Sequence, residues 1–107
     1  MSLRKLKRNQ ELKKALSLAK KAIELEPENA SYLDTIGWIY FKLDNPKKAQ
    51  AYIESSININ GENAIVLEHL GDVLMKIQKS DDAIDYYKRA LSLDKNNPRL
   101  MKKVSPE

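Results

Sequence analysis

The feature that most constrains this chain is one fixed spacing that recurs along it, the interval from Asn29 to Asn63. Three asparagines, two glycines and three alanines follow this spacing: Asn29, Asn63 and Asn97; Gly37 and Gly71; Ala15, Ala49 and Ala83. A fixed period of about 34 residues marks a tandem repeat, in which each unit is one supersecondary element that must stack on its neighbours to bury its apolar face. The sequence therefore predicts a stack of small units rather than a single deep core.

Aligned on the two glycines, the chain divides into a partial unit, two full units and a short end. The expected boundaries are residues 1–29, residues 30–63, residues 64–97 and, for a short C-terminal capping helix and tail, residues 98–107. Within each unit apolar residues recur every three or four positions, which is the spacing of one face of an α-helix. Each full unit is therefore predicted to hold two helices, at residues 30–43 and 46–59 in the first unit and at residues 64–77 and 80–93 in the second.

The breaks between these segments carry helix-start signals. Asn45 is expected to cap the free backbone N–H groups of one helix, with Pro46 in the first position, where its missing N–H costs nothing. Ser80 is expected to do the same in the next unit, where Asp81 and Asp82 place negative charge at the positive end of the helix dipole. Asp81, Asp82 and Asp85 resemble a carboxylate cluster, but the first two are explained by their place at the start of the helix.

Small residues have a defined place in this pattern. Gly37 and Gly71 fall inside the first helix of each unit, and Ala49 and Ala83 fall inside the second. A glycine in the middle of a helix destabilises it by roughly 1 kcal/mol relative to alanine, so its presence indicates a packing requirement. We expect the two helices of each unit to cross closely at these residues.

This pattern resembles the tetratricopeptide repeat family, whose signature runs Leu-Gly-x-x-Tyr in the first helix and then Ala and a large apolar residue in the second. The matching residues are Leu33, Ile36, Gly37, Tyr40, Ala49 and Ile53 in the first full unit and Leu67, Leu70, Gly71, Leu74, Ala83, Tyr87 and Ala90 in the second. The resemblance implies an all-α fold, an α-solenoid of antiparallel helix hairpins in a right-handed superhelical stack, with residues 1–107 as a single domain. Residues 34–40 are also similar to the terminal repeats of longer bacterial members, so we expect the chain to be part of a larger, bacterial protein.

The two ends of the chain depart from the repeat. Residues 3–25 contain neither Gly nor Pro, so they form either one long helix or a hairpin, and in both cases an apolar surface is expected to stay partly open. At the other end Met101 and Val104 repeat the positions of Leu67 and Leu70. This predicts a capping helix over residues 98–104 with its Lys-rich face turned outward.

The residue content gives little support to catalysis. The chain has one His and no Cys, and it carries no Gly-rich phosphate loop and no motif that combines a nucleophile with a base. His69 and Asp72 lie one turn apart and are the best pair for a metal, but two ligands are too few for a structural site. We therefore predict a protein that is not an enzyme and needs no cofactor or metal.

Charge is distributed unevenly along the chain. Residues 1–21 hold eight Lys or Arg and one acidic residue, whereas residues 22–94 hold seven basic and thirteen acidic residues. No aromatic residue interleaves with the basic start, so a solvated helix face is favoured over a patch for nucleic acid or for an acidic protein. The sequence has no apolar run long enough for a membrane span or a secretion signal, and the default expectation is a cytoplasmic protein that binds neither membrane nor nucleic acid.

In the tetratricopeptide repeat family the first helices of the units line a concave groove that binds other proteins. The resemblance places the following residues in this groove: Asp34, Thr35, Trp38, Phe41 and Lys42 from the first full unit, and Glu68, His69, Asp72, Met75 and Lys76 from the second. Trp38 lies off the core stripe and is the expected anchor for a ligand. The predicted function is therefore a protein-interaction scaffold.

The character of the partner is argued from charge. Some members of the family hold the C-terminal carboxylate of a peptide with Lys, Asn and Arg side chains on the inner helices. At those places this chain has Thr35, Ile65 and His69, with Glu68 and Asp72 nearby, whose charges repel a carboxylate. A basic or apolar peptide or helix is expected instead.

Two other functions stay open at this point. One is a structural spacer, or a module that associates with further repeats or with a second copy, giving a homodimer through the open N-terminal edge. The other is an RNA-binding helical repeat, which the acidic middle of the chain makes the least favoured of the three.

Overall fold

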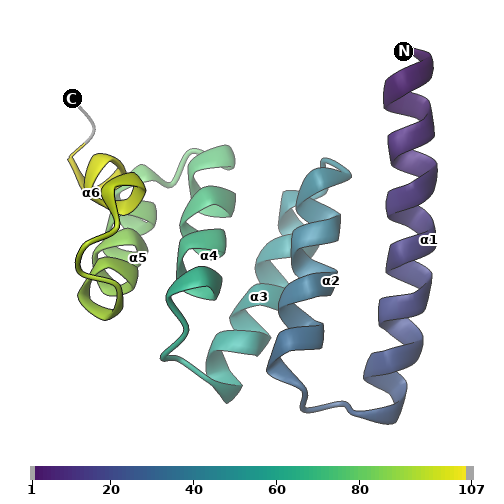
Figure 1. Ribbon diagram of the computed structural model, residues 1–107, viewed down its shortest axis with the longest axis horizontal. Helices are drawn as coiled ribbons and strands as arrows, with labels where there is room; N and C mark the ends of the chain where they lie inside the picture. The colour runs from purple at the N-terminus through teal and green to yellow at the C-terminus, as the bar shows by residue number, and fades with distance from the viewer. Residues whose placement is uncertain (1, 106–107) are drawn as a thin grey trace.

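In the computed structural model, which describes residues 2–105, the chain folds into six α-helices, and this part contains no strand (Figure 1). The helices are α1 (Leu3–Leu25), α2 (Ala30–Lys42), α3 (Pro46–Ile59), α4 (Ala64–Lys76), α5 (Ser80–Leu93) and α6 (Pro98–Val104). Helices α2 and α3 form one hairpin and α4 and α5 form the next, while α1 packs on α2 and α6 packs on α5. The prediction of an all-α solenoid is confirmed, and residues 3–25 form one helix rather than a hairpin.

Asparagine side chains start most of these helices as the sequence predicts. The Oδ1 atom of Asn29 accepts the backbone N–H of Tyr32 at 3.0 Å, and that of Asn45 accepts the N–H of Lys48 at 3.3 Å. Asn63 and Asn97 cap α4 and α6 in the same way. Each cap satisfies N–H groups that have no partner inside the helix.

Helix α5 starts differently, and here the prediction for Ser80 is wrong. Ser80 is the first residue of α5, Lys79 occupies the capping position, and no side chain caps the helix. Lys79 stands where the preceding unit has Asn45 and Ser80 stands where it has Pro46, so the serine falls inside the helix. Asp81 and Asp82 lie in the first turn, where their charges stabilise the exposed N–H groups.

The turns inside the hairpins fix where α2 and α4 end. Asp44 and Gln78, which occupy equivalent positions of the repeat, both have a left-handed backbone, with φ of 65° and 63°. The N–H of Asn45 donates to the carbonyl of Tyr40, and the N–H of Lys79 donates to that of Leu74, each at 2.9 Å. This Schellman arrangement ends each helix one residue before the predicted boundary.

Both helix-interior glycines lie at close helix crossings. A Cβ atom on Gly37 would lie 2.6 Å from Cγ1 of Ile53 and 3.1 Å from the carbonyl oxygen of Ala49. A Cβ atom on Gly71 would overlap the ring of Tyr87. The expected packing role of the two glycines is therefore confirmed.

The C-terminal helix α6 is oriented differently from the prediction. Leu100 is 1% exposed and anchors α6 in the core, whereas Met101, the expected core residue, is 45% exposed. Because Leu100 points inward and Lys103 lies three positions after it, Lys103 turns toward α4, whereas Lys102 is exposed. The prediction of an outward Lys-rich face is therefore wrong for Lys103, which pairs with acidic residues of α4.

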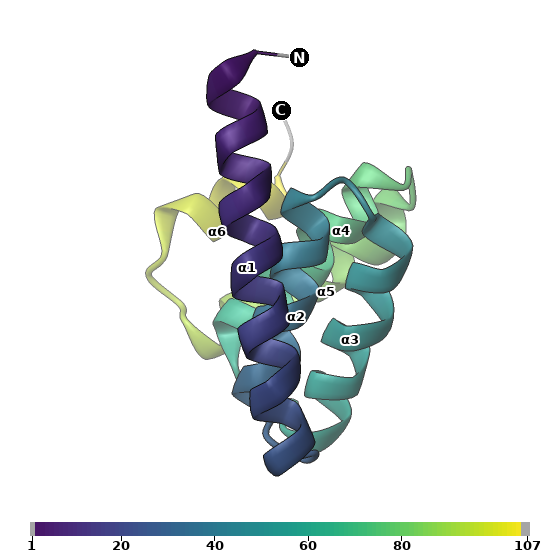
Figure 2. The ribbon, with the colours of Figure 1, turned by 90° about the vertical axis from the view of Figure 1, so that its right-hand side faces the viewer.

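At the other end, α1 is bound on one side only. None of its residues is buried, and Leu3, Leu18 and Leu25 are all more than half exposed. Figure 2 shows the N-terminal part of α1 extending past the other helices. Over residues 2–105, no helix combines the length and the apolar character that crossing a membrane requires.

Candidate functional site

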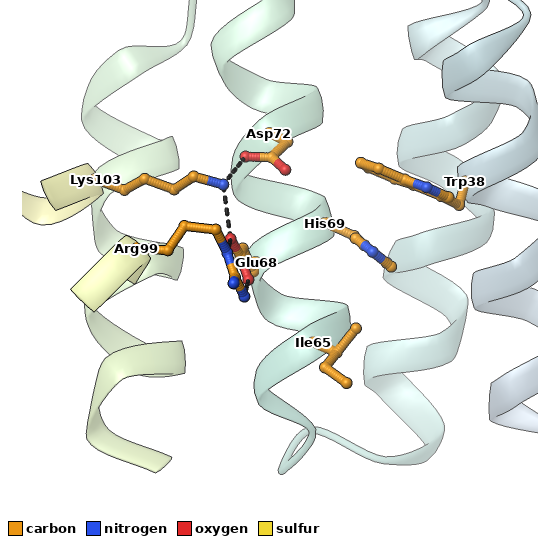
Figure 3. A pocket seen from close by; sticks show the side chains of 7 residues that line it. All are labelled: Trp38, Ile65, Glu68, His69, Asp72, Arg99 and Lys103. Atoms are coloured by element: carbon orange, nitrogen blue, oxygen red, sulfur yellow. Dashed lines mark hydrogen bonds and ion pairs between the residues drawn. The ribbon is translucent and has the colours of Figure 1, made fainter. Parts of the chain in front are cut away.

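A hollow of about 390 Å³ lies on the face shared by α2, α4 and α6 (Figure 3). It is lined by Trp38, Ile65, Glu68, His69, Asp72, Arg99 and Lys103. Helix α4 supplies four of these residues, which recur along it at helical spacing and therefore share one face of the helix. We call this hollow the groove.

Aromatic stacking forms the α2 side of the groove. The ring of Trp38 stacks on the ring of His69, with centroids 4.0 Å apart and planes at 17°, and on the ring of Phe41, with centroids 4.9 Å apart. His69 Nδ1 also lies 3.0 Å from Oδ1 of Asp34. These contacts join the two hairpins, so Trp38 is partly covered and held in place before any ligand binds.

Ion pairs form the α6 side of the groove. Arg99 donates to Glu68 through Nε at 2.7 Å and through Nη2 at 2.8 Å, and Lys103 Nζ donates to the same carboxylate at 2.7 Å. Glu68 is only 6% exposed, so this carboxylate depends on its partners for solvation. The hydrogen bonds from Arg99 outweigh the opposing effect of burial and lower the pKa of Glu68 to about 2.

Asp72 is paired as well. Its Oδ1 accepts the hydroxyl of Tyr87 at 2.7 Å and lies 3.0 Å from Nζ of Lys103. Burial and the Asp72 carboxylate raise the pKa of the Tyr87 hydroxyl above its usual range, so this hydroxyl stays a donor. The network thus links α4, α5 and α6 through Asp72 and Lys103.

The imidazole of His69 has a different partner from the one considered for a metal. His69 pairs with Asp34 of the neighbouring hairpin rather than with Asp72. Within residues 2–105 no three His, Asp or Glu side chains gather closely enough to hold a metal ion.

The structure brings together part of the predicted groove set. Trp38, Glu68, His69 and Asp72 line the groove. Phe41, Lys42 and Lys76 line a second hollow near the ends of α2 and α4. The remaining three are Asp34, which contacts His69, Thr35, whose hydroxyl donates to the carbonyl of Ser31, and Met75, which is exposed.

The groove also contains residues outside the predicted set, namely Ile65, Arg99 and Lys103. Arg99 follows Ile65 by one full repeat period, and Lys103 follows His69 by the same interval. Extending the period into the capping segment would therefore have placed both cations on the groove face.

Comparison with known sequences supports the repeat assignment. The family model described as anaphase-promoting complex, cyclosome, subunit 3 matches residues 8–90. No curated protein sequence matches the chain.

Comparison with solved structures gives the same fold. The first TPR domain of Spaghetti (RPAP3), bound to the HSP90 peptide SRMEEVD, superposes with a TM-score of 0.86 at 19% identity, covering 92% of this chain and 79% of that one. MamA gives a TM-score of 0.84 at 22% identity, covering 99% of this chain and 63% of that one. TTC0263, a thermophilic TPR protein in Thermus thermophilus, gives 0.80 at 22% identity, covering 89% of this chain and 48% of that one.

This chain thus spans less than two thirds of MamA and of TTC0263. The family match covers most of the chain, and its helical hairpins stack as they do in these structures. The chain belongs to the family described as anaphase-promoting complex, cyclosome, subunit 3, and with it to the tetratricopeptide repeat proteins.

Proposed function

We propose that this domain is a non-enzymatic interaction module that binds a segment of another protein in the groove. An apolar side chain of that segment is held between Trp38 and Ile65. The observation that carries the proposal is the groove itself, in which Trp38 is fixed by stacking and Ile65 stands 62% exposed. A fixed aromatic ring beside an exposed aliphatic side chain gives an apolar ligand group a preformed place to bind, and such anchors are where binding energy concentrates.

The charges around the groove favour an apolar ligand over a basic one. Glu68 and Asp72 are paired with cations of α6, and Asp34 is paired with His69. A basic ligand would have to compete with these internal partners, whereas an apolar side chain would not. The similar domain of Spaghetti (RPAP3) is bound to an HSP90 peptide, which supports peptide capture as a use of this architecture.

The test is a selection of peptides from a random library, followed by calorimetric titration of the selected peptides. We expect Trp38→Ala to weaken binding at least about tenfold and Ile65→Ala to weaken it several-fold, because each removes one apolar wall. Lys88→Ala, on the exposed face of α5, is the matched control and should leave the affinity unchanged. If the selected peptides bind Trp38→Ala and Ile65→Ala as tightly as they bind the wild type, binding occurs outside the groove.

A second function, self-association through the N-terminal edge, is favoured by the exposed leucines of α1. Leu18 is 68% exposed and Leu25 is 85% exposed. Sedimentation at increasing concentration should then show a dimer that Leu18→Glu abolishes. A monomer at every concentration and salt level would exclude this function.

A further inference from the structure

A second hollow, of about 520 Å³, lies where α1 passes the C-terminal ends of α2 and α4. Four cationic side chains line it: Lys5 and Arg8 from α1, Lys42 from α2 and Lys76 from α4. The same hollow contains one carboxylate, that of Asp44, and one aromatic ring, that of Phe41. We call it the cationic hollow.

The four cations have no ion-pair partner in the part of the chain that the structure describes. Lys42 and Lys76 lie in the last turns of their helices, where they offset the negative end of the helix dipole. Lys5 and Arg8 do not offset a helix dipole, because they lie in the first half of α1 rather than in its last turn. The charged side chains of this first half are themselves mostly Lys and Arg. Lys42 also has its Nζ 6.0 Å from the centroid of the Trp38 ring, a distant cation–π contact. The hollow thus presents four positive charges against the single carboxylate of Asp44, so an anion that enters it reduces the repulsion among them.

The cationic hollow and the groove adjoin each other through one stacked pair. Trp38 lines the groove, Phe41 lines the cationic hollow, and their rings are 4.9 Å apart. The two hollows are therefore separated by one aromatic pair on α2, and a single extended segment is long enough to reach both.

We propose that the cationic hollow binds the acidic part of the partner segment, two or more Asp or Glu residues that flank the apolar side chain held in the groove. This inference rests on the proposed function and adds the polarity of the ligand. A protein segment is favoured over nucleic acid, because residues 22–94 carry thirteen acidic against seven basic residues and would repel a long polyanion outside the hollow.

The test compares three capped peptides that share one Leu and differ in a flanking triplet of Glu, Gln or Lys. Calorimetry at low salt should give the Glu peptide an affinity about fivefold or more above the Gln peptide, as two or three exposed ion pairs allow. The Lys peptide should bind most weakly. The advantage of Glu over Gln should disappear in a variant carrying Lys42→Gln and Lys76→Gln and should decline with added salt.

The matched control carries Lys88→Gln and Lys95→Gln, two exposed lysines outside the hollow, and should keep the advantage. Equal affinities for the Glu and Gln peptides, or an advantage that survives in the Lys42 and Lys76 variant, would overturn the inference. A single-stranded RNA that binds more tightly than the Glu peptide would overturn it in favour of nucleic acid.

The two proposals fail in different ways. Suppose that Trp38→Ala abolishes the binding of all three peptides and that the wild type binds the Glu and Gln peptides equally. The groove proposal would then stand, and the proposal for the cationic hollow would be refuted. If none of the peptides binds, a capped hexaglutamate titrated against the amide signals of α1, α2 and α4 decides the question. No movement of the signals around Lys5, Lys42 and Lys76 would then refute the cationic hollow.

Discussion

Glu68 offers the sharpest test of the groove, because its carboxylate joins α4 to α6 in addition to the packing of Leu100. Its partners Arg99 and Lys103 both come from α6, and its 6% exposure leaves water little access. Replacing it by Gln keeps the shape of the side chain and removes the charge. The Glu68→Gln variant therefore separates the contribution of the ion pairs from that of packing.

The magnitude follows from the pKa of this carboxyl. The ordinary value of 4.5 falls to about 2 in the folded state. Since one pKa unit corresponds to about 1.4 kcal/mol, the full contribution to the free energy of unfolding is about 3 kcal/mol. The Arg99 side chain is 60% exposed, so water screens part of its attraction, and we expect a loss of about 2 kcal/mol at pH 7.

The sign of the pH dependence follows from the direction of the shift. The pKa of Glu68 is lower in the folded than in the unfolded chain, so the stabilisation is complete above about pH 5. It declines as the pH falls toward 2, and more than half of it is lost by about pH 3. The difference in stability between the wild type and Glu68→Gln should therefore shrink steadily over this range.

Urea denaturation followed by far-UV circular dichroism, at several pH values between 3 and 7, measures this difference. The matched control is Glu54→Gln, since Glu54 is exposed on α3 and bonds only to Gln50 in the described chain. The control should change stability by less than about 0.5 kcal/mol at every pH. Parallel pH profiles for the wild type and Glu68→Gln would refute the reasoning.

Three further predictions concern the fold and are checked by the same denaturation assay. Gly71→Ala should lower stability by about 1–2 kcal/mol, because the clash of a Cβ atom with the ring of Tyr87 costs more than the gain in helix propensity. The loss should be smaller in a Tyr87→Leu background, where the ring is absent. Gln78→Gly should raise stability by about 0.5–1 kcal/mol, because the left-handed φ of 63° at this position strains any residue other than glycine. Gln50→Gly inside α3 should lower stability instead, and a loss at both sites would contradict the left-handed turn. Ser56→Ala should cost about 1 kcal/mol by removing the 2.8 Å hydrogen bond to the carbonyl of Ala30, while Ser55→Ala should be nearly neutral, and equal effects would count against that bond.

The helices and their closest crossings could be predicted from the sequence, because they depend on features that repeat. The repeat period and the positions of Gly37 and Gly71 are enough to locate both hairpins and the points where their helices cross. The predicted start of α5 at residue 80 also agrees with the structure, but the capping role expected of Ser80 does not. Lys79 occupies the repeat position of Asn45, so the capping position of α5 lacks the short polar side chain that α3 has there.

The groove is harder to predict, because its chemistry depends on contacts between units. The orientation of α6 is set by whether Leu100 or Met101 enters the core, and both are apolar residues of similar size. In the observed orientation Lys103 bonds to both Glu68 and Asp72. A prediction made unit by unit counts the two carboxylates and leaves out the cations that neutralise them.

This dependence also explains how a solenoid of short units can change its ligand. Arg99 and Lys103 occupy the repeat positions of Ile65 and His69, so the charge facing each carboxylate is supplied by the following unit and not by its own. A helix in the place of α6 that carried neutral residues at these two positions would leave Glu68 and Asp72 without cations. The same first two hairpins would then present an acidic groove suited to a basic segment. Affinity for basic peptides should therefore rise in a variant that carries Arg99→Gln and Lys103→Gln, and calorimetry against the peptide with the Lys triplet measures it; an unchanged affinity would mean that the carboxylates of α4 do not face the ligand.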